Sequence, residues 1–163
     1  MQSREWRIKA FDELTTRELY ALMRLRQEVF VVEQRCAYLD ADGLDPLARH
    51  LFAIEFTGES TGERESGGEL RLGACARLFA PGVRGDEAVI GRVVSAPALR
   101  KSGVGRELMT RAIAACGAHT PIRIGAQQYL ERFYRSFGFE RAGDDYLEDD
   151  IPHLPMLRRG QDG

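Results

Sequence analysis

A basic turn that contains two glycines is the part of the sequence that most directly suggests chemistry. In "VVSAPALRKSGVGRELMTRAIAACG", Arg100, Lys101, Gly103 and Gly105 separate an apolar stretch from the periodic pattern of a helix. The first turn of a helix has backbone N–H groups without partners, and the aligned peptide dipoles add partial positive charge there. Because glycine has no Cβ, a bulky group can approach the backbone closely. The turn therefore predicts an anion site, with phosphate as the natural occupant and a plain structural turn as the alternative.

Two familiar nucleotide motifs do not fit this turn. No GKS or GKT follows the glycines, which excludes a Walker loop. A dinucleotide fingerprint would need a third glycine and an acidic residue about 20 positions further on, and both are missing. Another kind of nucleotide-dependent enzyme remains a minor alternative.

A second pattern lies in "YLERFYRSFGF". Leu130, Phe133, Tyr134 and Phe137 recur at helical spacing, and Gly138 ends the helix. The spacing by itself makes Tyr134 a packing residue whose hydroxyl is satisfied.

Both patterns resemble motifs of the GNAT superfamily of N-acetyltransferases. The superfamily motif has the form (Arg/Gln)-x-x-Gly-x-(Gly/Ala), and it follows a strand and opens a helix. Residues 100–105, Arg-Lys-Ser-Gly-Val-Gly, match this motif. Pro97, three residues before the arginine, is also usual there. Tyr134, Gly138 and Phe139 match the superfamily's Tyr-x-x-x-Gly-Phe.

The resemblance covers nearly the whole chain. Residues 25–50 and 146–156 further resemble the small bacterial ElaA-like branch of the superfamily. Gln127 stands where many members carry asparagine, which leaves one hydrogen bond to the cofactor open.

The resemblance implies acetyl transfer from acetyl-CoA to a primary amine. Backbone amides from Ser102 to Arg106 would hold the pyrophosphate, and the Val93–Ser95 strand would bond the pantetheine arm like an added strand. The N–H near Val94 would polarise the thioester carbonyl. The implied cofactor-binding residues are Val93, Val94, Ser95, Arg100, Lys101, Ser102, Gly103, Val104, Gly105, Arg106, Gln127, Phe133 and Tyr134.

The resemblance also gives Tyr134 the role of general acid for the departing thiolate. A base is needed because an alkyl amine is mostly protonated at neutral pH. Glu33 and His153 are the leading candidates for that base, and His50, Glu148 or a water stay open. Six acidic residues would attract a cationic amine if they line the pocket: Asp40, Asp42, Asp45, Glu148, Asp149 and Asp150. A CoA-binding sensor or scaffold without turnover is the alternative function.

Apolar periodicity and turn signals predict the elements that position these residues. The fold class is α/β, a mixed and strongly twisted GNAT-like sheet with helices on both faces, in one domain over 1–163. The strands at Val93 and Ile122 would run parallel and part at one end. The C-terminal segment, residues 140–159, would form two strands broken by Pro152 and Pro155. The glycine-rich segment Thr57–Glu69 would be a mobile hairpin tip. The expected strands are 5–11, 50–56, 70–80, 88–96 and 122–127. Helices are expected to follow Thr15 and Gly103, and a short helix is expected to begin at Tyr129.

The composition of the chain bears on which kinds of molecule the protein binds. The formal net charge of −2 and the absence of an aromatic basic platform give no support for nucleic-acid binding. The cysteines Cys36, Cys75 and Cys116 have no metal-ligand spacing, and no metal is expected. With no apolar leader and no stretch of membrane-spanning length, the sequence predicts a cytoplasmic protein that forms no membrane contact. A homodimer is possible.

Overall fold

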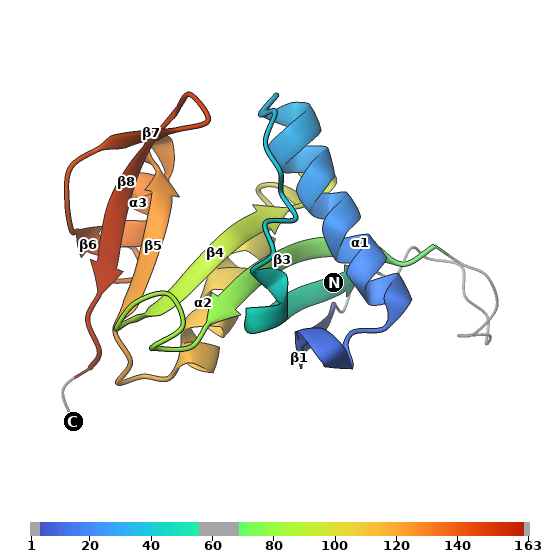
Figure 1. The fold of residues 1–163 in the computed structure, drawn as a ribbon, viewed down its shortest axis with the longest axis horizontal. Helices are drawn as coiled ribbons and strands as arrows, with labels where there is room; N and C mark the ends of the chain where they lie inside the picture. The colour runs from blue at the N-terminus through green and yellow to red at the C-terminus, as the bar shows by residue number, and fades with distance from the viewer. Residues whose placement is uncertain (1–3, 56–68, 162–163) are drawn as a thin grey trace.

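The computed structural model describes residues 4–55 and 69–161. They form an eight-stranded sheet in the order β1-β2-β3-β4-β5-β8-β6, and β7 pairs with β8 (Figure 1). The strands are β1 (Glu5–Ala10), β2 (Arg49–Glu55), β3 (Arg71–Phe79), β4 (Ala88–Ser95), β5 (Ile122–Gln127), β6 (Glu140–Arg141), β7 (Tyr146–Glu148) and β8 (Ile151–Arg158). The helices are α1 (Thr16–Arg26), α2 (Val104–Cys116) and α3 (Glu131–Arg135).

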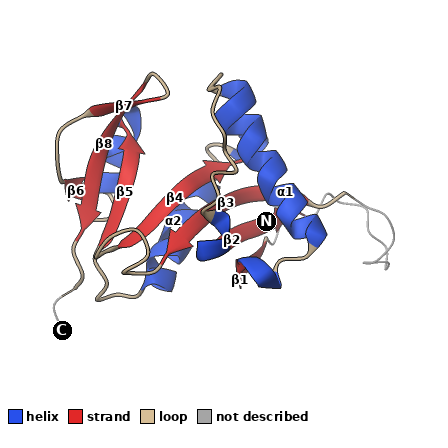
Figure 2. Ribbon diagram, in the orientation of Figure 1, coloured by secondary structure: helices blue, strands red, loops and turns tan. Residues whose placement is uncertain are grey.

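The sheet is divided into two parts that share only a short junction. The strands β1 to β4 are antiparallel, as are β5 and β8. Between the two parts, β4 and β5 run parallel and pair only at Ala88 with Ile122 and at Val89 with Arg123. Beyond these pairs the two strands diverge, which is visible in Figure 2. The predicted parting of two parallel strands is confirmed.

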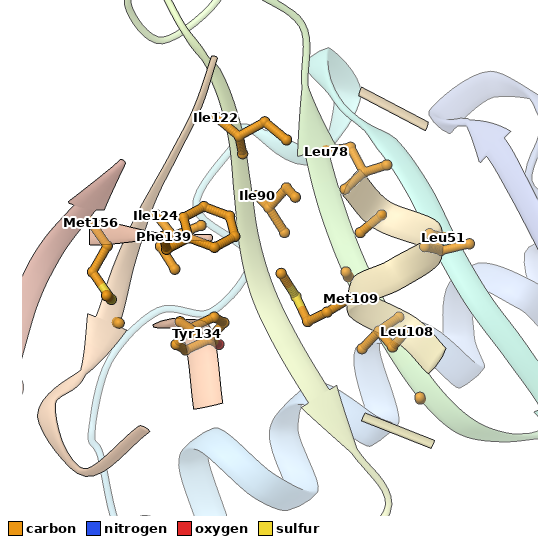
Figure 3. Close-up of a cluster of buried hydrophobic side chains, with 14 of the residues drawn as sticks. Leu51, Leu78, Ile90, Leu108, Met109, Ile122, Ile124, Tyr134, Phe139 and Met156 are labelled. Carbon is orange, nitrogen blue, oxygen red and sulfur yellow. The ribbon is translucent and has the colours of Figure 1, made fainter. Parts of the chain in front are cut away.

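Each face of the sheet packs against its own helices because side chains alternate along the strands. Leu22 and Leu25 of α1 pack against Phe52 on one face. On the other face, Leu108 and Met109 of α2 lie in a core cluster that also contains residues of β2 to β5, β8 and α3 (Figure 3). The helices thus cover both faces, as the sequence predicted.

The first helix begins at a capping box and ends in a wider turn. The Thr15 side chain accepts a hydrogen bond from the Glu18 N–H at 3.1 Å, and the Glu18 carboxylate accepts one from the Thr15 N–H at 2.9 Å. The periodic pattern predicted one helix, but α1 stops at Arg26 and continues as a π-helix over Gln27–Glu33. Such segments are uncommon and concentrate at functional sites.

A β-bulge in β4 changes which face its side chains occupy. The register shifts between Arg77 opposite Gly91 and Cys75 opposite Val94, and Arg92 adopts φ of 49°. As a result, Ile90 belongs to the α2 face, whereas Val94 packs on the α1 face. Bulges increase strand twist and terminate regular pairing. The bulge therefore lies where β4 leaves its neighbour β5.

The prediction that prolines break the tail into strands was wrong, because Pro152 and Pro155 both lie inside β8. The carbonyl of Pro155 accepts a hydrogen bond from the Ala142 N–H at 2.9 Å, so it points toward the side of β8 where β6 and β7 lie. The nitrogen and the carbonyl of one strand residue point to the same side, so the nitrogen of Pro155 lies in the gap between the residues paired with β6 and those paired with β7. The nitrogen of Pro152 faces β5, one residue beyond the last pair, Gln127 with His153. Neither proline removes a ladder hydrogen bond. The predicted hairpin tip lies, except for Glu69, outside the described residues.

Candidate active site

A cavity of about 970 Å³ lies where β4 and β5 diverge. Its wall includes residues of the π-helix, β4, the glycine turn, α2, β5, α3 and β8. The cavity brings together residues that are far apart in the chain, such as Glu33 and His153, which 120 positions separate. Of the residues predicted for cofactor binding and catalysis, all except Ser102 line this cavity.

The first turn of α2 presents backbone donors. Gly103 precedes the helix with φ of 87°, and the first intrahelical bond joins the Glu107 N–H to the Gly103 carbonyl at 3.0 Å. The N–H groups of Val104, Gly105 and Arg106 therefore have no intrahelical acceptor. A Cβ on Gly103 or Gly105 would meet no atom within 4 Å, so the space in front of these donors is open.

The basic residues before the helix are placed differently from one another. Arg100 and Lys101 line the cavity, and the Arg100 guanidinium lies 2.6 Å from the Glu33 carboxylate. Ser102 does not line the cavity. Its N–H donates to the Leu99 carbonyl at 3.1 Å, and its hydroxyl accepts a hydrogen bond from Arg4. The available amides of this turn thus begin after Ser102.

Tyr134 presents a hydroxyl from a buried ring. The ring packs edge-on against Phe133 and Phe139, with centroids 5.2 and 6.1 Å away. Tyr134 lines the cavity, and no hydrogen bond within the described residues engages its hydroxyl. Burial, with a smaller effect of Tyr129, raises the pKa of the Tyr134 hydroxyl, which therefore keeps its proton at neutral pH.

The imidazole of His153 is held in one orientation. Its Nδ1 lies 2.7 Å from the Ile151 carbonyl, which fixes the proton of the neutral ring on Nδ1 and leaves the lone pair on Nε2. Nε2 lies 3.6 Å from a carboxylate oxygen of Glu148, and the Tyr146 ring stacks on the imidazole at 5.6 Å. All of these residues line the cavity.

His50 lies outside the wall of this cavity. It is buried in β2, and its Nε2 lies 3.0 Å from the Asp45 carbonyl. Burial lowers the pKa of His50, so the ring is neutral in the core. His50 is therefore a hydrogen-bonded histidine of the core and is not part of the candidate site.

Four of the six carboxylates considered for amine attraction, Asp40, Asp42, Asp45 and Asp150, do not line the cavity, and that part of the hypothesis is wrong. Asp40, Asp42 and Asp45 are engaged by arginines instead. Asp45 lies 2.7 Å from Arg26 and 3.2 Å from Arg77. Burial would raise the pKa of Asp45. The hydrogen bond from Arg26 and the positive charges of Arg26 and Arg77 outweigh this effect and lower the pKa. Glu148 and Asp149 do line the cavity.

Sequence reasoning missed the arginines on the sheet. Arg77 and Arg92 line the cavity from β3 and β4, and Arg92 lies 5.3 Å from the Tyr38 ring. Arginine in the middle of the apolar stretch "LRLGACARLFA" was the available signal, because a charged residue is rarely buried without partners. The partners, Asp42 and Asp45, lie more than 30 positions away in the chain, so the pattern alone did not reveal the pairing.

A close approach at Gly125 was also missed. A Cβ at this position would come 2.5 Å from the Tyr146 hydroxyl, so only glycine lets Tyr146 reach this part of the wall. Gln127, two residues later on the same strand, donates a hydrogen bond to Gln34 at 3.2 Å. The side chain of Gln127 thus links β5 to the segment after the π-helix.

Groups of three or more His, Cys, Asp or Glu side chains that could hold a metal ion are absent from residues 4–55 and 69–161.

No helix in the described part of the chain is both long and apolar enough to span a membrane.

Comparison with known proteins agrees with this geometry. Residues 79–159 match the family described as "Acetyltransferase (GNAT) domain". Protein ElaA of Escherichia coli is 38% identical over 157 residues, which cover 94% of this chain and 95% of ElaA. The crystal structure of Escherichia coli ElaA superimposes with a TM-score of 0.81 over 96% of this chain and all of the other, at 37% identity. An acyl-CoA N-acyltransferase from Pseudomonas aeruginosa superimposes with a TM-score of 0.82, at 42% identity over 96% and 99% of the two chains.

The divided sheet, the glycine turn and these relatives define the class, and the chain belongs to the GNAT family of acyl-CoA-dependent acyltransferases. Its likeness to ElaA confirms the resemblance drawn from residues 25–50 and 146–156.

Asp42 should contribute stability that disappears in acid. Hydrogen bonds from Arg77, 2.8 Å to each carboxylate oxygen, lower the pKa of Asp42 below its usual value near 3.8. A carboxylate whose pKa is lower in the folded state stabilises the fold above its unfolded pKa and loses that effect as pH falls through the folded pKa. Asp42→Asn should therefore cost about 2 kcal/mol at neutral pH, and this difference should shrink as the pH falls below about 4.

Urea unfolding of wild type and Asp42→Asn at neutral and acid pH measures this difference. Asp86→Asn, at an exposed position, is the matched control and should match wild type at both pH values. An equal difference between wild type and Asp42→Asn at both pH values would contradict the assignment.

Proposed function

We propose that this protein transfers the acetyl group of acetyl-CoA to a primary amine on a small molecule or a protein. The single observation that supports this proposal is the cavity, which is lined both by the α2 turn with its open donors and by Tyr134. Membership of an acyl-CoA-dependent family supports the proposal.

The residues present fit acetyl-CoA. The N–H groups of Val104, Gly105 and Arg106, with Arg100 and Lys101 beside them, suit a pyrophosphate. The edge of β4 at Val93, Val94 and Ser95 has no β5 partner, so its backbone is free to bond an extended arm. Acetyl-CoA supplies a thioester, and attack by the amine yields an amide and a free thiol.

Tyr134 is the proposed acid of the reaction. Its hydroxyl is protonated and free of hydrogen bonds within the described residues. It can therefore donate its proton to the thiolate that leaves when the amide forms.

His153 is the proposed base, and Glu33 is the second candidate. The Nε2 lone pair of His153 has no hydrogen-bond donor within the described residues, and a proton accepted there would face the carboxylate of Glu148. The Glu33 carboxylate is instead paired with Arg100 at 2.6 Å, so that pair would have to separate first. We therefore assign removal of the amine proton to His153.

The whole chain is proposed to act as one domain in the cytoplasm. Strands from both ends of the described chain, β1 and β8, join the same sheet, and Cys36, Cys75 and Cys116 are free thiols. Free thiols fit a reducing compartment. The homodimer remains a prediction from the sequence.

Blocking the glycine turn should abolish binding of acetyl-CoA. Acetyl-CoA at about 100 times its Kd should add about 2.7 kcal/mol, which is an upward Tm shift of roughly 5–10 °C. Gly105→Trp should remove this shift, because the bulky side chain enters open space in front of the turn without a clash. Thermal unfolding with and without acetyl-CoA measures it.

Gly105→Ala is the matched control, since its methyl group contacts nothing within 4 Å, and it should keep most of the shift. Wild type that shows no shift at millimolar acetyl-CoA would refute the acetyltransferase proposal.

Removing the Tyr134 hydroxyl should impair turnover and spare binding. Tyr134→Phe keeps the buried ring, so its Tm shift with acetyl-CoA should equal that of wild type. With an amine found by screening for thiol release, kcat should fall by about 100-fold or more. Binding of acetyl-CoA by wild type with no turnover of any amine would instead favour the sensor or scaffold.

His153→Gln should lower kcat by about 100-fold, with partial rescue by added imidazole. Glu33→Gln is the matched comparison and should change kcat by only a few fold, because it removes an ion pair rather than the base. The assay is thiol release at saturating acetyl-CoA. A larger loss of kcat in Glu33→Gln than in His153→Gln would transfer the role of base to Glu33.

A further inference from the structure

The cavity carries opposite charges at its two ends. Glu148 and Asp149, which we call the acidic end, line it beside His153, whereas the carboxylate of Glu33 is paired with Arg100. His153 pairs with Gln127, the last residue of β5, where β4 and β5 have separated. The acidic end therefore lies at the open end of the divergence and suits a protonated amine before it reacts.

Four arginines line the other end: Arg77, Arg84, Arg92 and Arg123. We call them the arginine end. Arg123 stands opposite Val89, at the junction where β4 and β5 are still paired. Arg84 lies in the turn that leads from β3 into β4. The arginine end thus occupies the closed end of the divergence.

The carboxylates that pair with these arginines do not line the cavity. Arg77 and Arg92 bind Asp42 and Asp40 at 2.8 and 2.9 Å, and Arg123 binds Glu87 at 2.8 Å. The arginines thus contribute to the cavity wall, and their carboxylate partners do not.

Two of the arginines keep donors that are not used. Arg84 has no carboxylate partner within residues 4–55 and 69–161, and its guanidinium lies 5.3 Å from the Phe79 ring. Arg77 lies 5.0 Å from the same ring, its side chain is only 3% exposed, and its Nε has no hydrogen-bond partner. The guanidinium of Arg84, which has no carboxylate partner among the described residues, is therefore the donor at this end that is open to a ligand.

We propose that the acceptor is an amine that also carries a carboxylate or phosphate group, with its oxyanion bound at the arginine end and its amine at the acidic end. This inference rests on the proposed function, because it names the substrate class of that same site. Guanidinium groups match both oxyanions, since they offer two parallel donors to two oxygens.

The distance between the two ends sets the form of the acceptor. Five residue steps of β4 lead from Val89, at the junction, to Val94, beside the proposed reaction centre. At about 3.3 Å per residue they span at most roughly 17 Å, because the bulge at Arg92 shortens the strand, and the arginine side chains cover part of this length. An acceptor with several bonds between its amine and its anion fits this span, and a six-carbon chain is a suitable probe.

The test uses four matched amines: 6-aminohexanoate, 6-aminohexyl phosphate, 6-amino-1-hexanol and 1,6-diaminohexane. Their binding to the complex of the protein with CoA is measured by calorimetry, and their acetylation by thiol release. At least one of the two anionic probes should bind about tenfold more tightly than the alcohol and the diamine, and the stronger of the two identifies carboxylate or phosphate as the group recognised.

The variants separate charge recognition from folding. Arg84→Gln should weaken the anionic probes about tenfold and leave the alcohol and the binding of CoA unchanged. Arg84→Glu should reverse the order and favour the diamine. Arg17→Gln, at an exposed position of α1, is the matched control and should behave as wild type.

Equal binding of all four probes would overturn the inference, as would an absence of binding by both anionic probes at millimolar concentration. In either case CoA binding and turnover of another amine would leave the proposed function standing. Wild type that does not bind CoA would overturn both.

Discussion

The short junction between β4 and β5 is the constraint on which the site depends. Two pairs of residues hold the strands together, and the bulge at Arg92 then turns β4 away. Because the strands diverge, the part of β4 after Val89 has no hydrogen-bonding partner in β5, and this free edge faces the space between the two parts of the sheet. The same divergence creates the volume between the two parts of the sheet. A ligand that satisfies the free edge of β4 would complete the sheet that the chain leaves incomplete.

Buried charge is the second constraint, and it acts on the wall of the cavity. Three arginines, Arg26, Arg77 and Arg92, share three aspartates from the segment between the π-helix and β2. A buried charge must be paired, because desolvation costs several kcal/mol per ion. Here the pairing also anchors an irregular segment to the sheet, so the loop that carries Tyr38 becomes a fixed part of the wall.

Much of the fold followed from the sequence because local patterns determine local structure. The capping box at Thr15, the glycine before α2 and the alternation in β1 to β5 each specify their elements within a few residues. The two motifs at 100–105 and 134–139 also located the glycine turn and Tyr134 on the cavity wall. The features that could not be predicted from the sequence depend on residues that are far apart in the chain. Pro155 is tolerated in β8 because its nitrogen faces the gap between β6 and β7, and Pro152 because its nitrogen lies beyond the last pair with β5. The aspartates of residues 40–45 face arginines from other elements rather than the cavity.

The order of the strands has a consequence for how the protein is made. The part of the sheet from β1 to β4 is joined by consecutive antiparallel pairs and carries its own helix, so it can assemble as soon as β4 has left the ribosome. The opposite wall needs β8, the last strand in chain order, to pair with β5. A nascent chain therefore holds the free edge of β4 for the whole time that α2, β5 and α3 are being translated. During that interval the bulge at Arg92 protects the chain, since an irregular, charged edge is a poor template for aggregation.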